Sequence, residues 1–135
     1  MCKVTLIAGT GRSGTTFLVS LFTMLNLPTG IDFSMVENVQ KTHARAGLEI
    51  YPHLKDNNFP CNKSLSIYKS PFLTFSVKLW KHAENINEVI IPIREGKQAA
   101  LSREHQTKNY KSKIGGYMFA NSTESQENLN NKLLS

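Results

Sequence analysis

An apolar run near the start of the chain leads directly into a glycine-rich loop, and this junction most constrains the fold. Residues 4–8 (VTLIA) are aliphatic and β-branched, which is typical of a buried strand in a parallel sheet. Residues 9–16 (GTGRSGTT) follow, and apolar residues then recur at helical spacing from Phe17 to Leu25. A strand, a tight loop and a helix in this order direct backbone N–H groups and the helix dipole at one point. The sequence therefore predicts a phosphate-binding loop, because a purely structural turn needs fewer glycines and hydroxyls.

The alternation of strands and helices continues along the chain. Residues 66–69 and 89–93 are predicted strands, and residues 96–108 are a predicted helix with Ala99, Ala100 and Arg103 at helical spacing. Pro71 ends the second strand, and an apolar helical stripe follows it, formed by Phe72, Phe75, Leu79 and Ala83. This order predicts an α/β fold, with a small parallel sheet flanked by helices and a ligand site at the carboxyl ends of the strands.

The remaining segments have weaker patterns. Met35 to Val39 suggests a short helix, and residues 44–51 suggest another. Thr123 and Gln126 form a possible capping box for a final helix that ends near Leu134. Residues 31–61 are expected to shape the pocket of a second substrate, but they contain no motif that identifies it.

Composition limits the size and the partners of the fold. The 135 residues are expected to form a single domain, and a formal net charge of +6 favours an anionic partner. Lysine and arginine are spread along the chain, which argues against nucleic-acid binding. Cys2 and Cys61 lack the spacing of a disulfide framework or a zinc site. The longest early apolar run is too short for a signal peptide or a membrane span, so a cytoplasmic protein without a membrane partner is expected.

The glycine loop matches two common nucleotide-binding patterns imperfectly. Gly9, Gly11 and Gly14 fit the dinucleotide pattern GxGxxG, but no second strand leads to an acidic residue about twenty positions later. Gly9 and Gly14 also have the spacing of a Walker A loop, yet Thr15 stands where that loop has its lysine. Arg12 offers a replacement cation inside the loop, and Thr15 and Thr16 offer hydroxyls.

The segment GRSGTTFL, residues 11–18, closely resembles the 5′-phosphosulfate loop of sulfotransferases, commonly written [KR]SGT[TS]. The resemblance implies a three-layer P-loop-like fold that binds 3′-phosphoadenosine 5′-phosphosulfate (PAPS) as cosubstrate. The implied cofactor-binding residues of this loop are Gly11, Arg12, Ser13, Gly14, Thr15 and Thr16.

Two further segments extend the resemblance from about Lys3 to Arg103. Sulfotransferases bind the 3′-phosphate with an arginine at a strand end and a serine eight residues later, which Arg94 and Ser102 match. Lys69, in YKSP, resembles the strand-end lysine that faces the transferred sulfo group, so it is a candidate for stabilising the bridging oxygen. Both residues also have an interpretation without a function. Lys69 could be an ordinary exposed lysine at a strand end, and Ser102 could lie on a solvated helix face.

The chain departs from the family at two points. Cytosolic sulfotransferases have a catalytic histidine two residues after the lysine, where this chain has Pro71. Glycan-type relatives use a glutamate instead, so the candidate bases are Glu37, Glu49, His43 and His53, and the expected catalytic set is Arg12, Lys69 and Glu49. Family members are also much longer, which suggests a shortened member without the family's C-terminal part.

The predicted function is sulfo transfer from PAPS to a hydroxyl or amine of a small-molecule or glycan acceptor. Fixed cations and N–H dipoles would stabilise the leaving phosphate, so no metal is expected. Two alternatives remain: a P-loop nucleoside or nucleotide kinase-like protein, and a non-catalytic nucleotide-binding module. The sequence leaves the acceptor, the catalytic competence of the short chain and the oligomeric state open.

Overall fold

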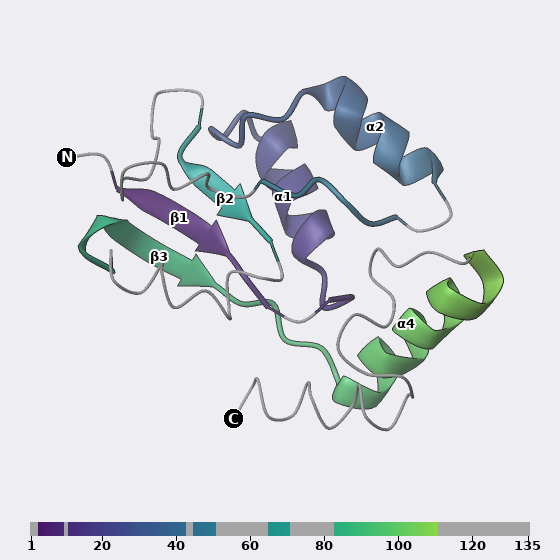
Figure 1. Cartoon of the computed structure of the whole chain (residues 1–135). Helices are drawn as coiled ribbons and strands as arrows, with labels where there is room; N and C mark the ends of the chain where they lie inside the picture. The colour runs from purple at the N-terminus through teal and green to yellow at the C-terminus, as the bar shows by residue number, and fades with distance from the viewer. Residues whose placement is uncertain (1–2, 10, 43–44, 51–64, 71–82, 111–135) are drawn as a thin grey trace.

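The computed structural model describes residues 3–9, 11–42, 45–50, 65–70 and 83–110. Strands and helices alternate in the described chain (Figure 1). Their order is β1 (Val4–Ile7), α1 (Thr15–Met24), α2 (Phe33–Lys41), β2 (Ile67–Lys69), the 3-10 turn η2 (Ala83–Asn85), β3 (Ile86–Ile90) and α4 (Gly96–Tyr110). The predicted α/β class is therefore confirmed at this level.

The three strands form one parallel sheet in the order β2-β1-β3, as predicted for strands that alternate with helices. The last residue of β1, Ile7, pairs with Lys69 on one side and with Ile90 on the other. All three strands therefore end at the same edge of the sheet. The segments that follow them carry the predicted phosphate loop, Lys69 itself and Arg94, so the topology brings the predicted site residues to one edge.

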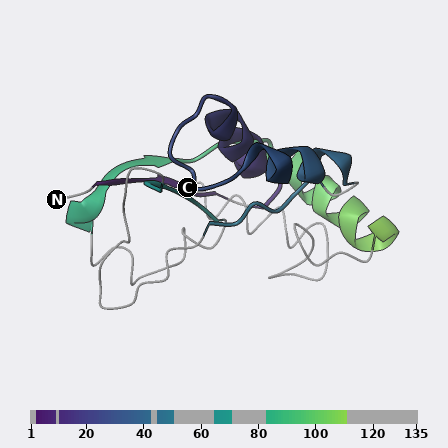
Figure 2. The same ribbon diagram turned by 90° about the horizontal axis from the view of Figure 1, so that it is seen from above.

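The central strand β1 is buried on both faces. Alternate residues of this strand point to opposite faces, as the pleat of a strand requires. Val4, Leu6 and Ala8 pack with Tyr68 on one face, and Ile7 packs on the other in a cluster completed by Val19, Val36, Leu48 and Ile67. The second cluster lies under α1 and α2, which cover the same face of the sheet (Figure 2). The helical stripe predicted after Pro71 lies outside the described residues, except for Ala83, which begins η2.

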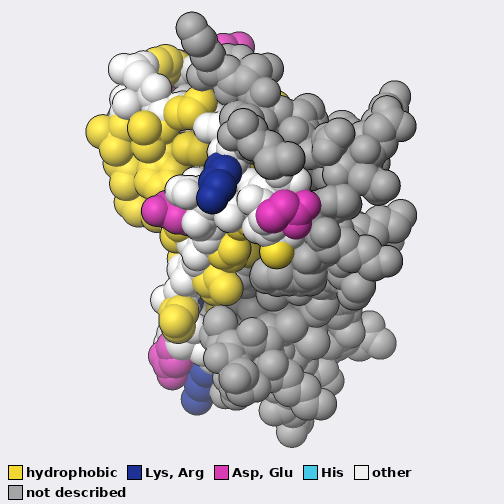
Figure 3. Space-filling model, turned by 90° about the vertical axis from the view of Figure 1, so that its left-hand side faces the viewer, with side chains coloured by type: hydrophobic (Ala, Val, Ile, Leu, Met, Phe, Trp, Pro, Cys, Tyr) yellow, Lys and Arg dark blue, Asp and Glu magenta, His cyan; other side chains and the backbone are white. Residues whose placement is uncertain are grey.

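Helix α1 has more apolar residues than its packed face can hold. Val19 is buried and Leu18 and Phe22 are partly buried, whereas Phe17, Leu21 and Leu25 are exposed. Other large exposed side chains around the end of α1 and the start of α2 are Met24, Leu27, Phe33 and Met35. Hydrophobic side chains also gather on the molecular face shown in Figure 3. The helical prediction for this segment is confirmed, but only part of its apolar stripe belongs to the core.

Two predicted elements differ from the structure. Residues 45–50 are not helical, because Arg45, Gly47 and Leu48 have left-handed φ values of 42°, 116° and 55° and Ile50 bridges to Lys69 in a strand-like pairing. The third strand runs over Ile86–Ile90 instead of residues 89–93. It ends before Pro92, which has no N–H group for a ladder hydrogen bond.

The remaining predicted helix, from Thr123 to Leu134, lies outside the described residues. Among the described helices, none is both long and apolar enough to span a bilayer.

Candidate phosphate-binding site

The loop between β1 and α1 has a backbone that depends on glycine at two positions. Gly9 and Gly14 adopt φ values of 135° and 111°, which glycine reaches without steric cost. Gly14 is the N-cap of α1 and supplies no side-chain cap, so the first N–H groups of the helix keep their capacity for an external acceptor. A cavity of about 300 Å³ opens over this turn, and its lining residues are Arg12, Ser13, Gly14, Thr15, Thr16, Phe17, Arg45 and Arg94.

The loop backbone predicts different effects for two neighbouring alanine substitutions. Gly9→Ala is expected to lower the free energy of unfolding by about 1–2 kcal/mol, the typical cost of a left-handed backbone for a residue with a Cβ atom. The new Cβ would also meet the Ser13 hydroxyl at 3.2 Å. Gly11→Ala is the matched control, since Gly11 has no left-handed φ and its nearest atom would be Arg103 Cδ at 4.0 Å. Urea unfolding of both variants measures the difference; equal loss of stability in the two would contradict this backbone assignment.

Arg12 connects the loop to helix α4. Its Nε–H donates to the Ser102 hydroxyl at 3.0 Å, and Arg94 Nη1 donates to the Arg12 carbonyl oxygen at 3.3 Å. Burial lowers the pKa of Arg12 from its ordinary value, and the nearby Arg94 charge lowers it further. Arg94 and Ser102, the predicted 3′-phosphate pair, thus both contact Arg12, and Ser102 is half-buried rather than on a solvated helix face.

Lys69 lies beneath the loop in a buried polar cluster. The residue is only 1% exposed, and its ammonium group donates to three oxygens: the Gly47 carbonyl at 2.6 Å, Glu49 Oε1 at 2.6 Å and Thr16 Oγ1 at 3.2 Å. Burial lowers the pKa of Lys69, while the Glu49 charge and hydrogen bond oppose that shift. The interpretation of Lys69 as an exposed strand-end lysine is therefore wrong.

Glu49 is the candidate base that the structure brings to the loop. Its side chain is 39% exposed, so the carboxylate contacts Lys69 and still reaches solvent. The left-handed turn at Gly47 and Leu48 carries it there, with Leu48 buried as an anchor. Glu37 lies exposed on α2, and His43 and His53 lie outside the described residues.

Two arginines of the site were not among the predicted site residues. Arg103 is buried and donates to the Gly11 carbonyl oxygen, which fixes the loop against α4. Arg45 lines the cavity from the turn after α2. The helical spacing of Ala99, Ala100 and Arg103 was a usable signal for the first, because all three are buried on one face of α4. No local pattern indicated Arg45.

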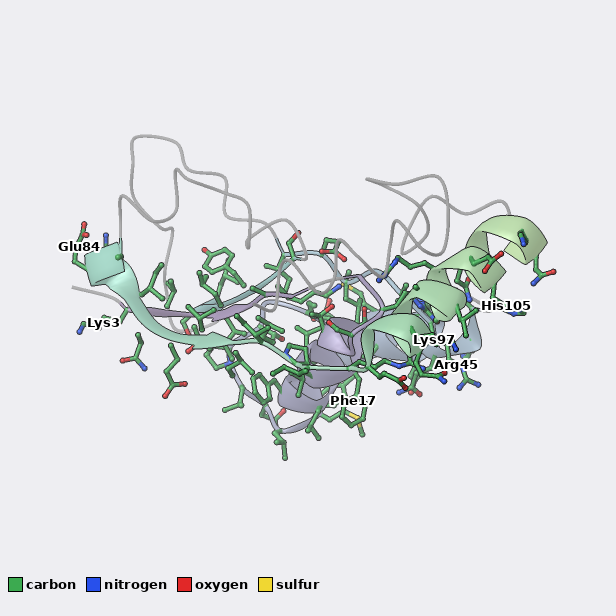
Figure 4. All side chains as sticks on the ribbon, turned by 90° about the horizontal axis from the view of Figure 1, so that it is seen from below. Lys3, Phe17, Arg45, Glu84, Lys97 and His105 are labelled. Carbon is green, nitrogen blue, oxygen red and sulfur yellow. The ribbon has the colours of Figure 1, made fainter. Side chains whose placement is uncertain are left out.

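Basic side chains gather at the end of the molecule where the strands end. Arg12, Arg45 and Arg94 line one cavity there. In Figure 4, Arg45 and Lys97 lie at this end, and Lys3 and Glu84 mark the opposite end. The arrangement favours an anion at the glycine loop through both its N–H groups and its cations.

Comparison with protein-family models, with characterised proteins and with solved structures finds no match for this chain. The geometry of the site is therefore the basis for a functional assignment.

Proposed function

We propose that the chain is a sulfotransferase-like protein with a P-loop-like fold, which binds PAPS at the β1–α1 loop and transfers its sulfo group to a hydroxyl acceptor. One observation carries the proposal: a loop hydroxyl, a buried lysine and a carboxylate meet at the carboxyl edge of the sheet. Thr16 belongs to the phosphate loop, and Lys69 contacts both it and Glu49. A phosphate loop alone would need neither the buried cation nor the carboxylate.

The residues around the cavity fit the groups of the nucleotide. The 5′-phosphosulfate would accept hydrogen bonds from the N–H groups at the start of α1 and from Arg12. The 3′-phosphate would lie at Arg94 and Ser102. A serine hydroxyl can accept one hydrogen bond and donate another, so Ser102 can hold Arg12 and donate to a phosphate at the same time.

The cluster also supplies what in-line transfer requires. The acceptor oxygen forms a bond to sulfur while the bond from sulfur to the bridging oxygen breaks, and the bridging oxygen leaves with 3′,5′-adenosine bisphosphate. Glu49 takes the proton of the acceptor hydroxyl through its solvent-accessible carboxylate. Lys69 stabilises the negative charge that grows on the departing oxygen, at a buried position where such a charge is poorly solvated.

Calorimetry with two nucleotides tests this proposal against the kinase-like alternative. The chain is expected to bind 3′,5′-adenosine bisphosphate equally in magnesium and in EDTA, because arginines and N–H groups supply the positive charge. ATP with magnesium is expected to bind more weakly than the bisphosphate. Tighter binding of ATP, with a requirement for magnesium, would instead indicate a nucleotide kinase-like site.

A further inference from the structure

A second cavity adjoins the phosphate cavity on the side of α2. Its volume is about 420 Å³, and its lining residues are Thr16, Phe17, Ser20, Val39, Gln40 and Arg45. The two cavities share Thr16, Phe17 and Arg45. A molecule in the second cavity would therefore lie next to the loop hydroxyl that Lys69 contacts.

The walls of this cavity combine an exposed aromatic ring with polar side chains. Phe17 is 69% exposed although it lies in the first turn of α1, so its ring offers an apolar surface to a ligand. Ser20 and Gln40 face the cavity from α1 and α2 and can donate or accept hydrogen bonds. A flat ring with polar substituents matches these walls better than a flexible apolar chain does.

Arg45 supplies a cation at the shared wall. Its backbone is held in the left-handed region, at a φ of 42°, by hydrogen bonds from its N–H group to the carbonyl and hydroxyl oxygens of Thr42. Within the described residues its guanidinium makes no hydrogen bond or ion pair. A strained backbone that presents a cation to a cavity is typical of a ligand contact.

We propose that this second cavity is the acceptor pocket and that it takes a small ring compound bearing both a hydroxyl and a carboxylate. The ring packs on Phe17, the carboxylate pairs with Arg45, and the hydroxyl points to Thr16 and the Lys69–Glu49 pair. The role of this pocket as an acceptor site rests on the proposed sulfo transfer. The binding of a ligand to the pocket can be measured without that reaction.

The test is a protein-detected NMR titration of the whole ¹⁵N-labelled chain with 4-hydroxybenzoate and its neutral analogue 4-hydroxybenzamide. We expect 4-hydroxybenzoate to shift the amide signals of Phe17, Ser20 and Gln40 and to bind about tenfold more tightly than the amide, as one charge-assisted hydrogen bond allows. Equal affinities would overturn the carboxylate assignment. Shifts confined to residues 12–15 would show that the probe only mimics a phosphate, and would overturn the pocket.

Two variants distinguish a direct contact of Arg45 with the carboxylate from an effect of the protein's net charge. Arg45→Asn removes the guanidinium but keeps a residue that tolerates the left-handed backbone, so the fold is retained and the preference for the carboxylate is expected to disappear. Lys41→Gln removes one charge from the exposed end of α2, outside the cavity, and is expected to leave the preference unchanged. If Arg45→Asn weakens only the binding of 3′,5′-adenosine bisphosphate, Arg45 belongs to the nucleotide site and the proposal is wrong.

A parallel titration with 3′,5′-adenosine bisphosphate keeps the two proposals distinct. If the nucleotide shifts the amide signals of residues 12–16, this supports the proposed function, whether or not 4-hydroxybenzoate binds. If 4-hydroxybenzoate binds selectively and the nucleotide does not bind, the proposal of a carboxylate-binding pocket stands and the proposal of sulfo transfer is wrong.

Discussion

Lys69→Met is expected to lower the rate of sulfo transfer by about 10²–10³-fold, the usual loss when one donor that stabilises transition-state charge is removed. Methionine keeps the aliphatic stem that fills the buried site and removes the ammonium group together with its three hydrogen bonds. The affinity for 3′,5′-adenosine bisphosphate is expected to change by less than about threefold, since the growing charge on the bridging oxygen is absent from the product.

Single-turnover transfer and equilibrium binding measure these two quantities separately. Lys41→Met is the matched control, because Lys41 is exposed on α2 and lines neither cavity. Thermal unfolding of the Lys69 variant shows whether it remains folded. A parallel fall in rate and affinity would show that Lys69 is a binding residue. It would contradict the proposal that Lys69 stabilises the departing oxygen in the transition state.

Arg12→Asn is expected to weaken the binding of 5′-phosphorylated nucleotide by about 1.5–3 kcal/mol, the size of a lost hydrogen bond to a charged group. This corresponds to roughly a 10- to 150-fold rise in Kd. Asparagine is chosen because Arg12 has a φ of 68°, a conformation that asparagine tolerates better than alanine. The Arg12 carbonyl that accepts from Arg94 stays in place.

The control for this variant is Lys108→Asn. Lys108 pairs with Glu104 on an exposed part of α4, so its loss changes the net charge without touching the loop. Calorimetry with AMP on both variants gives the comparison. An unchanged Kd for the Arg12 variant, or an equal loss in both, would contradict a direct contact between Arg12 and the phosphate.

The sequence predicted the elements whose signals are local. An aliphatic run before the glycines and helical spacing after them located β1 and α1, and the helix predicted over residues 96–108 is observed at Gly96–Tyr110. The apolar residues of α1 could be identified from the sequence, but their burial could not. Leu18 is partly buried and Phe17 is exposed because they lie on different sides of the helix, and the sequence does not show which side meets the sheet. The strand at Ile86–Ile90 was placed too late in the sequence because Asn87 and Glu88, near its start, are polar and exposed.

For the candidate site, too, the parts that depend on local sequence signals were predictable. The loop and the carboxyl edge followed from the order of elements. Arg94 and Ser102 were singled out by their resemblance to the 3′-phosphate pair, and the structure adds that both contact Arg12. The contact between Lys69 and Glu49 was not predictable, because the sequence pattern of residues 44–51 predicts a helix there. Its left-handed residues and its pairing with Lys69 depend on contacts distant in sequence, which periodicity does not encode.

Preference for a 3′-phosphate tests the central claim most directly, because a generic phosphate loop has no reason to show it. In a competition titration, the wild type is expected to bind 3′,5′-adenosine bisphosphate more tightly than AMP. Arg94→Ala is expected to abolish most of that preference, and Ser102→Ala to reduce it by about 1 kcal/mol, while both variants still bind AMP. Equal affinity of the wild type for the two nucleotides would contradict the sulfotransferase-like assignment.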